Sequence, residues 1–284
     1  MPDHPTIVII GAGTMGEAIV AGLLRTGLTT PEHIHCADPR EERVAELQTR
    51  YSIRPFTDNL KAIDKADVVI LSIKPQRMER VLAGLKDHIP AGALVLSIVA
   101  GVSINVISQA LNHASVVRSM PNTPAQIGEG ITVWTSSNQV TPTQKEFARR
   151  ILGAFGEDIY VEEEEENFLN MATALSGSGP AYIFLFMEAM IDAGVHLGFP
   201  RRISEKLVMQ TIRGSVNYFD RMKTHPAQLR NEVTSPGGTS AAALYYLEKA
   251  GIRTAISRAI WAAYERSQAL GKGEDAQPPK NHQD

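Results

Sequence analysis

Three short glycine-rich segments of this 284-residue chain carry neighbours suited to binding charged ligands. The first, Gly11-Ala12-Gly13-Thr14-Met15-Gly16, lies close to the N-terminus. The other two lie in the second half, Ser176-Gly177-Ser178-Gly179-Pro180 and Ser235-Pro236-Gly237-Gly238-Thr239-Ser240. The first segment suits a cofactor pyrophosphate, because N–H groups at a helix start bind phosphate oxygens. The other two suit a small polar substrate, and the combination is typical of an oxidoreductase.

The N-terminal segment has the spacing of a dinucleotide-binding fingerprint. Gly11 permits a tight turn, Gly13 lets the pyrophosphate approach the backbone, and Gly16 allows close packing of helix on strand. An apolar strand from Ile7 to Ile10 precedes the pattern and a helical pattern follows it. Because of this context we interpret the segment as a cofactor site rather than a plain structural turn.

Residues after the second predicted strand point to different nicotinamide cofactors. Asp38 lies where an acid binds the ribose hydroxyls of NAD, whereas Arg40 can pair with the 2′-phosphate of NADP. The sequence therefore leaves NADH and NADPH open. Lys74-Pro75 follows an apolar strand at the edge of the sheet where ligands bind. It fits a cofactor contact and a simple strand-ending turn equally well. Asn59 reads equally as the start of a helix with Asp58.

Short apolar runs alternate with helical patterns over the first 160 residues. Apolar runs without polar alternation indicate strands covered on both faces, as in a parallel sheet. We therefore expect an α/β fold, with residues 1–161 forming a Rossmann domain built on a doubly wound parallel sheet. The predicted strands are Thr6 to Ile10, Ile34 to Ala37, Val68 to Ser72, Leu94 to Ile98, Val116 to Arg118 and Ile131 to Trp134.

From Glu162 the strand signals stop, and residues 162–272 are predicted to form an all-α dimerisation and substrate domain. The segment from Ala181 to Met187 is apolar on every side of a helix, which requires burial all round and favours a partner subunit. Glu188, Asp192 and His196 then recur at helical spacing. A metal site is the alternative, but we favour a stripe exposed to solvent or at a subunit seam, and predict no metal.

Composition limits the class of protein. Hydrophobic residues make up 43% and charged residues 21%, as in globular proteins, and the net charge of −3 argues against nucleic acid. The single cysteine, Cys36, is expected to be a buried thiol in a reducing compartment. We find no signal peptide and no uncharged apolar stretch near the roughly 20 residues that span a bilayer. We expect a cytoplasmic protein without a membrane partner, with residues 273–284 forming a disordered tail.

A fourth segment, Met120-Pro121-Asn122-Thr123-Pro124-Ala125, forms a rigid loop at the carboxyl edge of the sheet. Together with the two glycine segments of the second half, it resembles the pyrroline-5-carboxylate reductases, which make proline. The resemblance runs from the fingerprint to about Leu270. It implies reduction of L-1-pyrroline-5-carboxylate to L-proline by hydride transfer from NADPH or NADH. It also implies a homodimer, or a ring of dimers, formed through interleaved C-terminal helices.

The resemblance further implies roles for individual residues. Cofactor contacts are expected at Ile10, Gly11, Ala12, Gly13, Thr14, Met15, Asp38, Arg40, Asn59, Ser72, Ile73, Lys74 and Pro75. Substrate contacts are expected at Asn122, Ser176, Gly177, Ser178, Gly179, Gly238, Thr239 and Ser240. Thr239 and Ser240 are assigned as catalytic. Family members usually carry threonine in place of Ser240, and the hydroxyl is retained here.

The expected substrate, a cyclic imine with one carboxylate, makes sense of these residue types. Free N–H groups from Ser176 to Gly179 would cradle the carboxylate, and the Ser240 hydroxyl would hydrogen-bond the ring nitrogen. A protonated imine is already electrophilic, so catalysis rests on positioning and needs no strong base. The alternative is that Ser240 has only a structural role, as the N-cap of a helix that begins near Ala241. The acidic run Glu162 to Glu166 reads as a solvated helix start.

Two rival functions remain open. One is another two-domain dehydrogenase that acts on a hydroxyacid or a different imine. It is weakened because the apolar stretch after Pro180 lacks the lysine or histidine that such chemistry requires. The other is a dinucleotide-binding regulatory protein without turnover.

Overall fold

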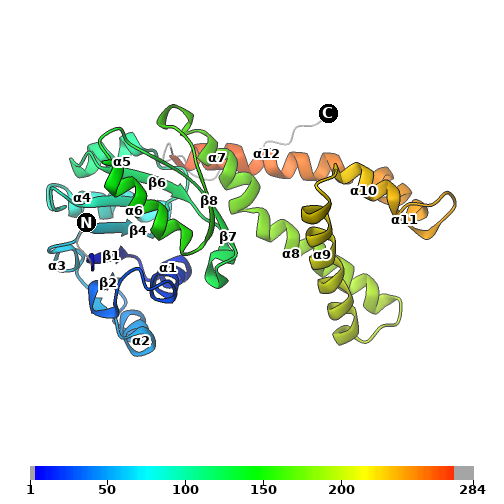
Figure 1. The fold of residues 1–284 in the computed structure, drawn as a ribbon, viewed down its shortest axis with the longest axis horizontal. Helices are drawn as coiled ribbons and strands as arrows, with labels where there is room; N and C mark the ends of the chain where they lie inside the picture. Colours follow the sequence, from blue (N-terminus) through cyan, green and yellow to red (C-terminus); the bar gives the residue numbers. More distant parts are fainter. Residues whose placement is uncertain (1–3, 272–284) are drawn as a thin grey trace. The chain divides into compact units, whose positions relative to one another are not determined.

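An eight-stranded sheet organises the N-terminal part of the chain in the computed structural model, which describes residues 4–271 (Figure 1). The strand order is β3-β2-β1-β4-β5-β6-β7-β8. The strands are β1 (Ile7–Ile10), β2 (Ile34–Ala37), β3 (Arg54–Phe56), β4 (Val68–Leu71), β5 (Leu94–Ser97), β6 (Val116–Met120), β7 (Gly130–Ser136) and β8 (Gly156–Tyr160). Strand order reverses beside β1, which places the turn after β1 at the usual ligand-binding crevice.

The predicted doubly wound α/β fold is confirmed, with one correction to the strand directions. β1 to β6 run parallel, but β7 pairs antiparallel with β6 and β8 pairs parallel with β7. The physical reason lies in the link between β6 and β7. Parallel neighbours need a crossover of about a dozen residues or more, and this link, residues 121–129, is shorter. The chain therefore turns back.

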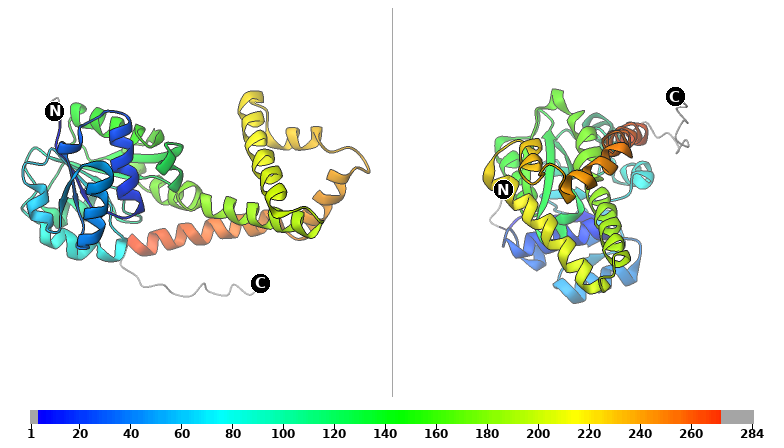
Figure 2. Two further views of the ribbon diagram at one scale, coloured as in Figure 1. Left: turned by 90° about the horizontal axis from the view of Figure 1, so that it is seen from below. Right: turned by 90° about the vertical axis from the view of Figure 1, so that its right-hand side faces the viewer.

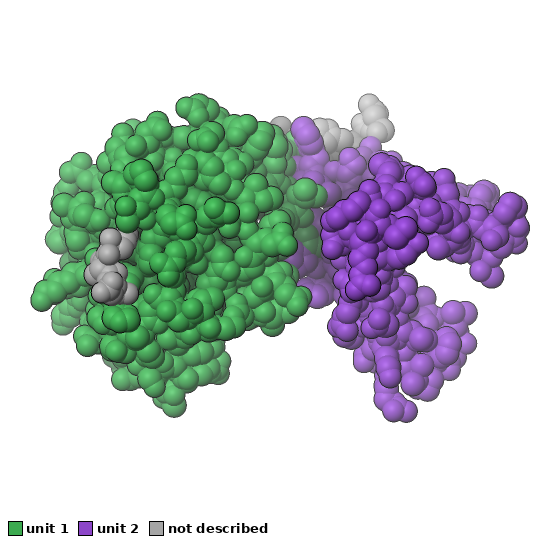
Figure 3. Space-filling view, in the orientation of Figure 1, with its two compact units in different colours: residues 1–179, 262–284 green, residues 180–261 purple. Residues whose placement is uncertain are grey.

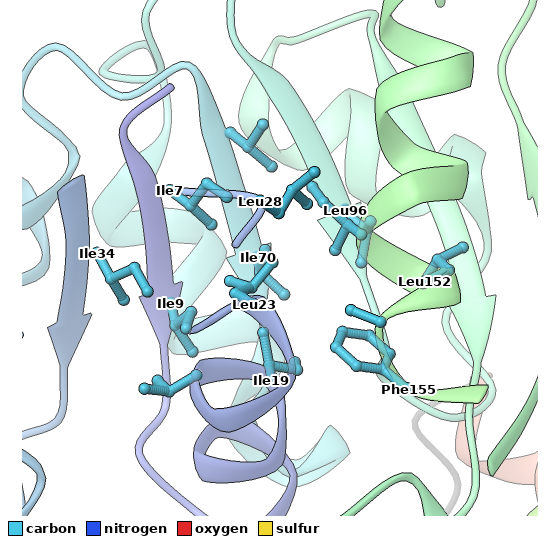
Figure 4. Close-up of a cluster of buried hydrophobic side chains, with 14 of the residues drawn as sticks. Ile7, Ile9, Ile19, Leu23, Leu28, Ile34, Ile70, Leu96, Leu152 and Phe155 are labelled. Atoms are coloured by element: carbon cyan, nitrogen blue, oxygen red, sulfur yellow. The ribbon is translucent and has the colours of Figure 1, made fainter. Parts of the chain in front are cut away.

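Helices cover both faces of the sheet (Figure 2). The helices of this part are α1 (Thr14–Arg25), α2 (Glu41–Tyr51), α3 (Asn59–Ile63), α4 (Met78–Leu85), α5 (Ile104–Leu111) and α6 (Pro142–Gly153). On one face Ile9 of β1 packs with Ile19 and Leu23 of α1 and with Phe155 (Figure 4). Each such side chain contributes about 1.5–3 kcal/mol on burial. This two-sided core holds the carboxyl ends of the strands in fixed register.

The rest of the described chain is helical, as predicted. Its helices are α7 (Phe168–Ala172), α8 (Gly179–His196), α9 (Arg201–Met222), α10 (Pro226–Glu232), α11 (Thr239–Lys249) and α12 (Ile252–Gly271). A π-helical turn, η5 (Thr173–Gly177), joins α7 to α8. The predicted tail, residues 273–284, lies outside the described residues.

The chain forms two compact units that divide elsewhere than at the predicted boundary of 161 (Figure 3). Unit 1 contains the residues up to Gly179 and the chain from Ala262 on, and unit 2 is Pro180–Trp261. α7 belongs to unit 1 because Arg118 of β6 donates hydrogen bonds to residues 166 and 170. In unit 2, all of which is described, only Ser204 and Val208 are buried. Unit 2 therefore has no core of its own.

Candidate active site

Two glycines in the turn after β1 are required by the protein's own backbone. Gly11 has φ +106°, and a Cβ there would lie 2.3 Å from the carbonyl oxygen of Ser72. A Cβ at Gly16 would lie 2.1 Å from the carbonyl oxygen of Gly11. Atoms cannot approach this closely, so β1, the end of β4 and α1 meet only because both positions are glycine.

Gly13 differs, because a Cβ there would meet nothing within 4 Å. It is the N-cap residue of α1, with φ −72°, and no side chain caps the helix. The first-turn N–H groups of α1 therefore have no side-chain acceptor, and they carry the positive end of the helix dipole. This open, donor-rich turn fits a nicotinamide dinucleotide, whose pyrophosphate would occupy the space beside Gly13.

Asp38, after β2, is tied to the same turn. Its Oδ2 accepts the N–H of Ala12 at 3.0 Å and Nη2 of Arg40 at 3.0 Å, and its Oδ1 accepts Nε of Arg40 at 2.8 Å. Burial raises the pKa of the Asp38 carboxyl, but the hydrogen bonds from Arg40 and Ala12 outweigh it, so the net pKa lies below its ordinary value. The carboxylate is buried, whereas the Arg40 side chain is 63% exposed.

Arg43 of α2 anchors this turn from the other side, a contact that the sequence analysis missed. Its Nε donates to the carbonyl oxygen of Ala12 at 2.7 Å, and its guanidinium pairs with Glu17 of α1. Ala12 is thus held through both its N–H and its carbonyl. The structure therefore places two arginines, Arg40 and Arg43, at the turn.

The other expected cofactor residues follow the neighbouring strands. The N–H of Ser72 donates to the carbonyl oxygen of Ile10 at 2.9 Å, and Ile73 packs beside Gly11. Lys74 is exposed and precedes a short 3₁₀ helix, η2 (Pro75–Arg77). Asn59 opens α3, where the Asp58 side chain accepts the N–H groups of residues 60 and 61. The structure thus brings Ser72 and Ile73 to Gly11, and contacts of Asn59 and Lys74 with a cofactor stay predictions.

The loop after β6 meets the first of the C-terminal glycine segments. The Asn122 Oδ1 accepts the N–H of Ile131 at 3.0 Å, which fixes the loop to β7. A Cβ at Gly177 would lie 2.6 Å from Cε of Met120. The structure therefore brings the expected substrate residues Asn122 and Gly177 to one edge of unit 1.

The segment from Ser176 to Gly179, expected to cradle the carboxylate, follows a helical path, and its role in substrate binding stays a prediction. The segment is no open loop but part of a π-helical turn that continues into α8. The N–H of Ser178 donates to the carbonyl oxygen of Thr173 at 2.8 Å, and the Ser176 hydroxyl donates to that of Ala172 at 3.0 Å. Pro180 lies in the first turn of α8, where its missing N–H costs no helical hydrogen bond.

The start of α11 has the open geometry that the segment from Ser176 to Gly179 lacks. Gly238 is the N-cap residue, with no side-chain cap, and Thr239 and Ser240 are the first two helical residues. Ser240 therefore does not cap a helix that begins near Ala241, and that alternative is wrong. Gly237 has φ +71°, which glycine tolerates without strain. These residues lie in unit 2.

Comparisons with known proteins identify the family. A family model described as pyrroline-5-carboxylate reductase dimerisation matches residues 166–270, and one described as NADP oxidoreductase, coenzyme F420-dependent, matches residues 6–101. A pyrroline-5-carboxylate reductase of Synechocystis is 43% identical over 267 residues, covering 93% of this chain and 97% of that protein. The chain belongs to the pyrroline-5-carboxylate reductase family.

Further relatives of the same family agree. The pyrroline-5-carboxylate reductase of Corynebacterium melassecola is 40% identical over 94% of this chain and 99% of its own length. A crystal structure of Plasmodium falciparum pyrroline carboxylate reductase with NADP bound superposes with a TM-score of 0.87 at 30% identity. It covers 95% of this chain and 100% of that one. The recognition made from the sequence is therefore confirmed.

Two further findings concern the helices of this reductase-family chain. Asp192, once considered with Glu188 and His196 as a metal alternative, pairs with Arg201 at 2.7 Å. Residues 4–271 contain no cluster of three potential metal ligands. The continuous helix Phe168–His196 is, by length and composition alone, apolar enough to cross a membrane, with 6% of that window buried. It falls entirely within the matched dimerisation region.

The sequence analysis also missed a buried ionic group in unit 1. Arg118 is 4% exposed at its side chain and pairs with Glu166 at 2.9 Å. The signal was present, because an arginine inside the apolar run Val116-Val117-Arg118 requires a buried partner. Glu166, read as part of a solvated helix start, is that partner.

Proposed function

We propose that this protein reduces L-1-pyrroline-5-carboxylate to L-proline with NADPH or NADH, the last step of proline biosynthesis. The observation that carries the proposal is the relation to pyrroline-5-carboxylate reductases over 93% of the chain. The geometry supports it independently, since the open turn at Gly13 suits a dinucleotide. The start of α11 suits a small anion.

The cofactor, when bound, supplies the hydride that reduces the imine carbon. On the protein side, the first turn of α1 would bind the pyrophosphate beside Gly13, where the open space lies. Asp38 would face the ribose hydroxyls and Arg40 a 2′-phosphate, because Asp38 accepts the N–H of Ala12 and Arg40 pairs with Asp38 at the end of β2. The residues from Ser72 to Pro75 would flank the cofactor at the end of β4.

We further propose that the substrate carboxylate lies at the first turn of α11. The N–H groups of Thr239 and Ser240 have no side-chain cap there, whereas the N–H of Ser178 is already donated to the carbonyl oxygen of Thr173. The Ser240 hydroxyl would then hydrogen-bond the ring N–H of the protonated imine. Asn122 and residues 176–179 would form the wall of the site that β6 supports. Catalysis would consist of holding the imine carbon at hydride-transfer distance.

The assembly in this proposal is a homodimer or a ring of dimers in the cytoplasm. Unit 2 exposes large apolar side chains, among them Phe184 at 62%, Leu185 at 67% and Tyr246 at 70%. Burial of such side chains against a second copy would complete the core that unit 2 lacks. The partner subunit would also supply one of the two substrate segments.

The test is oxidation of NADPH and of NADH by the purified protein with L-1-pyrroline-5-carboxylate, followed by absorbance and by detection of proline. Hydroxyacids and larger cyclic imines serve as competing substrates. Turnover of the five-membered imine at least about tenfold more efficient than that of the others is expected. Turnover of a hydroxyacid without turnover of the imine would refute the proposal. Cofactor binding without any turnover would favour the regulatory alternative.

A further inference from the structure

A buried arginine near the carboxyl end of β6 joins three elements of unit 1. Arg118 donates through Nη1 to Oε1 of Glu166 at 2.9 Å and through Nη2 to Oδ1 of Asn170 in α7 at 2.8 Å. The same Glu166 oxygen accepts the N–H of Ile104, the first residue of α5, at 2.8 Å. Hydrogen bonds between charged groups are short and strongly oriented. The group therefore acts as a rigid joint between β6, α5 and α7.

The end of α12 is fixed to the same joint. The Ser267 hydroxyl donates to Asn170 Oδ1 at 3.2 Å, and the Asn167 side chain donates to the Tyr264 hydroxyl at 3.1 Å. A Cβ at Gly101, in the loop before α5, would lie 2.6 Å from the carbonyl oxygen of Ser267. Asn170 thus receives hydrogen bonds from both β6 and α12.

The π-helical turn is held against β6 at a second point. Met120 lies two residues beyond Arg118, so the two side chains project from the same face of the strand. Its Cε approaches Gly177 so closely that a Cβ there would lie at 2.6 Å. From Asn170 to Gly177 the helix advances about two turns. The segment that contains Ser176 and Gly177 is therefore pinned at both ends by β6.

We propose that Arg118, acting through Asn170, is a positioning residue for the reduction. It sets the place of the π-helical turn relative to the carboxyl edge of the sheet, and through it the place of the substrate relative to the cofactor. This inference rests on the function proposed above. Misplacement of a reactive group by about 1 Å can lower the rate by about a hundredfold, so a joint of this kind has a kinetic consequence beyond stability.

The experiment compares full-length variants. Asn170→Ala removes the link to the turn and leaves the Arg118–Glu166 ion pair intact. Arg118→Lys keeps the charge but loses the two-pronged geometry. In both we expect kcat/KM for the imine to fall about tenfold, with the KM for NADPH within about twofold of the parent. The matched control is Arg149→Lys, at a 64% exposed arginine that pairs with Asp158 at 3.6 Å, and it should leave both parameters unchanged.

Hydrogen exchange of the peptides that cover residues 171–181, measured by mass spectrometry, gives a readout without substrate. We expect faster exchange in Asn170→Ala and parent-like exchange in Arg149→Lys. Parent-like imine kinetics in Asn170→Ala with a lower melting temperature would overturn the proposal. A fall of kcat that is matched by the same fall in the folded fraction of the variant, with both KM values unchanged, would also overturn it. Failure of the unsubstituted protein to reduce the imine would instead count against the proposed function.

Discussion

The packing of the chain does not by itself require glycine at position 13. Gly11 and Gly16 lie against backbone atoms of the protein, and any side chain there would overlap them. Gly13 faces open space, and its backbone angles are ones that any residue adopts. Under the proposed function, glycine is needed at this position because the pyrophosphate would occupy the space of a Cβ.

Alanine substitution separates these two requirements. Gly13→Ala should leave the melting temperature unchanged and weaken cofactor binding at least about tenfold, or ~1.4 kcal/mol. Gly16→Ala should lower stability, because its Cβ would lie 2.1 Å from the Gly11 carbonyl oxygen. Thermal melting and calorimetric titration with NADPH measure both effects. Parent-like cofactor affinity in Gly13→Ala would place the pyrophosphate elsewhere.

The single thiol of the chain is predicted to be inert. Cys36 is fully buried in β2, and burial, with a smaller contribution from Asp38, raises the pKa of its thiol to about 12. Only the thiolate reacts, so a disulfide reagent at pH 8 should not label the folded protein. One equivalent should react once guanidinium unfolds it. Rapid labelling under native conditions would contradict this burial.

At the scale of elements, we expect the residues at the end of β2 to set the preference between NADPH and NADH. The Arg40 side chain is 63% exposed and pairs with Asp38, which also accepts the N–H of Ala12, so a 2′-phosphate beside this turn would meet the guanidinium. Arg40→Gln should lower kcat/KM for NADPH about ten- to hundredfold, the worth of a hydrogen bond between charged groups, about 1.5–3 kcal/mol. The value for NADH should change little. An unchanged ratio of the two efficiencies would remove Arg40 from the cofactor site.

The start of α11 gives a corresponding prediction for Ser240. Since Gly238 is the N-cap residue, removal of the Ser240 hydroxyl deletes no helix cap. Ser240→Ala should therefore leave the melting temperature unchanged and lower kcat/KM for the imine about ten- to hundredfold. Ser240→Thr, which keeps the hydroxyl, should be nearly neutral. A stability loss with unchanged kinetics in Ser240→Ala would argue against the catalytic assignment.

Elements with a strong apolar pattern could be predicted from the sequence, whereas those decided by long-range packing could not. β1, β2, β4 and β5 are buried throughout and read as apolar runs. β3 and β8 lie at the sheet edges, are half-exposed and contain proline, glycine or acidic residues, so no apolar run marks them. The direction of β7 leaves no trace in its composition.

The same limit applies to the candidate site. The glycine fingerprint could be recognised from the sequence because each of its glycines has a local role. Gly11 and Gly13 lie in the turn after β1, where the pattern predicts them. The segment Ser176 to Gly179 was read as a loop from its serines and glycines, but helices on both sides carry the chain through it as a π-helical turn. Arg43 and Arg118 act on residues 31 and 48 or more positions away, which no local pattern reveals.

At the scale of the molecule, unit 2 is a set of helices without an interior. Among residues 180–261 only Ser204 and Val208 are buried, while α8, apolar on every side from Ala181 to Met187, exposes Phe184 and Leu185. Exposed apolar surface on this scale is unstable in water unless a partner covers it. The match to a reductase dimerisation model over residues 166–270 supports the proposal that a second subunit covers this surface.

This argument predicts that dimer formation and activity are lost together. Leu185, 67% exposed in α8, would be buried twice in a symmetric dimer, at about 1.5–3 kcal/mol for each copy. Leu185→Glu should therefore weaken dimerisation by roughly two to four orders of magnitude. Light scattering at micromolar concentration should report a dimer or a multiple of it for the parent and a monomer for the variant.

The matched control is Val106→Glu, at a 44% exposed position of α5 in unit 1, which should leave mass and turnover unchanged. Since each site would draw a substrate segment from the neighbouring subunit, the monomeric variant should retain NADPH binding through unit 1 but lose imine reduction. A parent protein that is a stable, active monomer would contradict both the interface and the shared site.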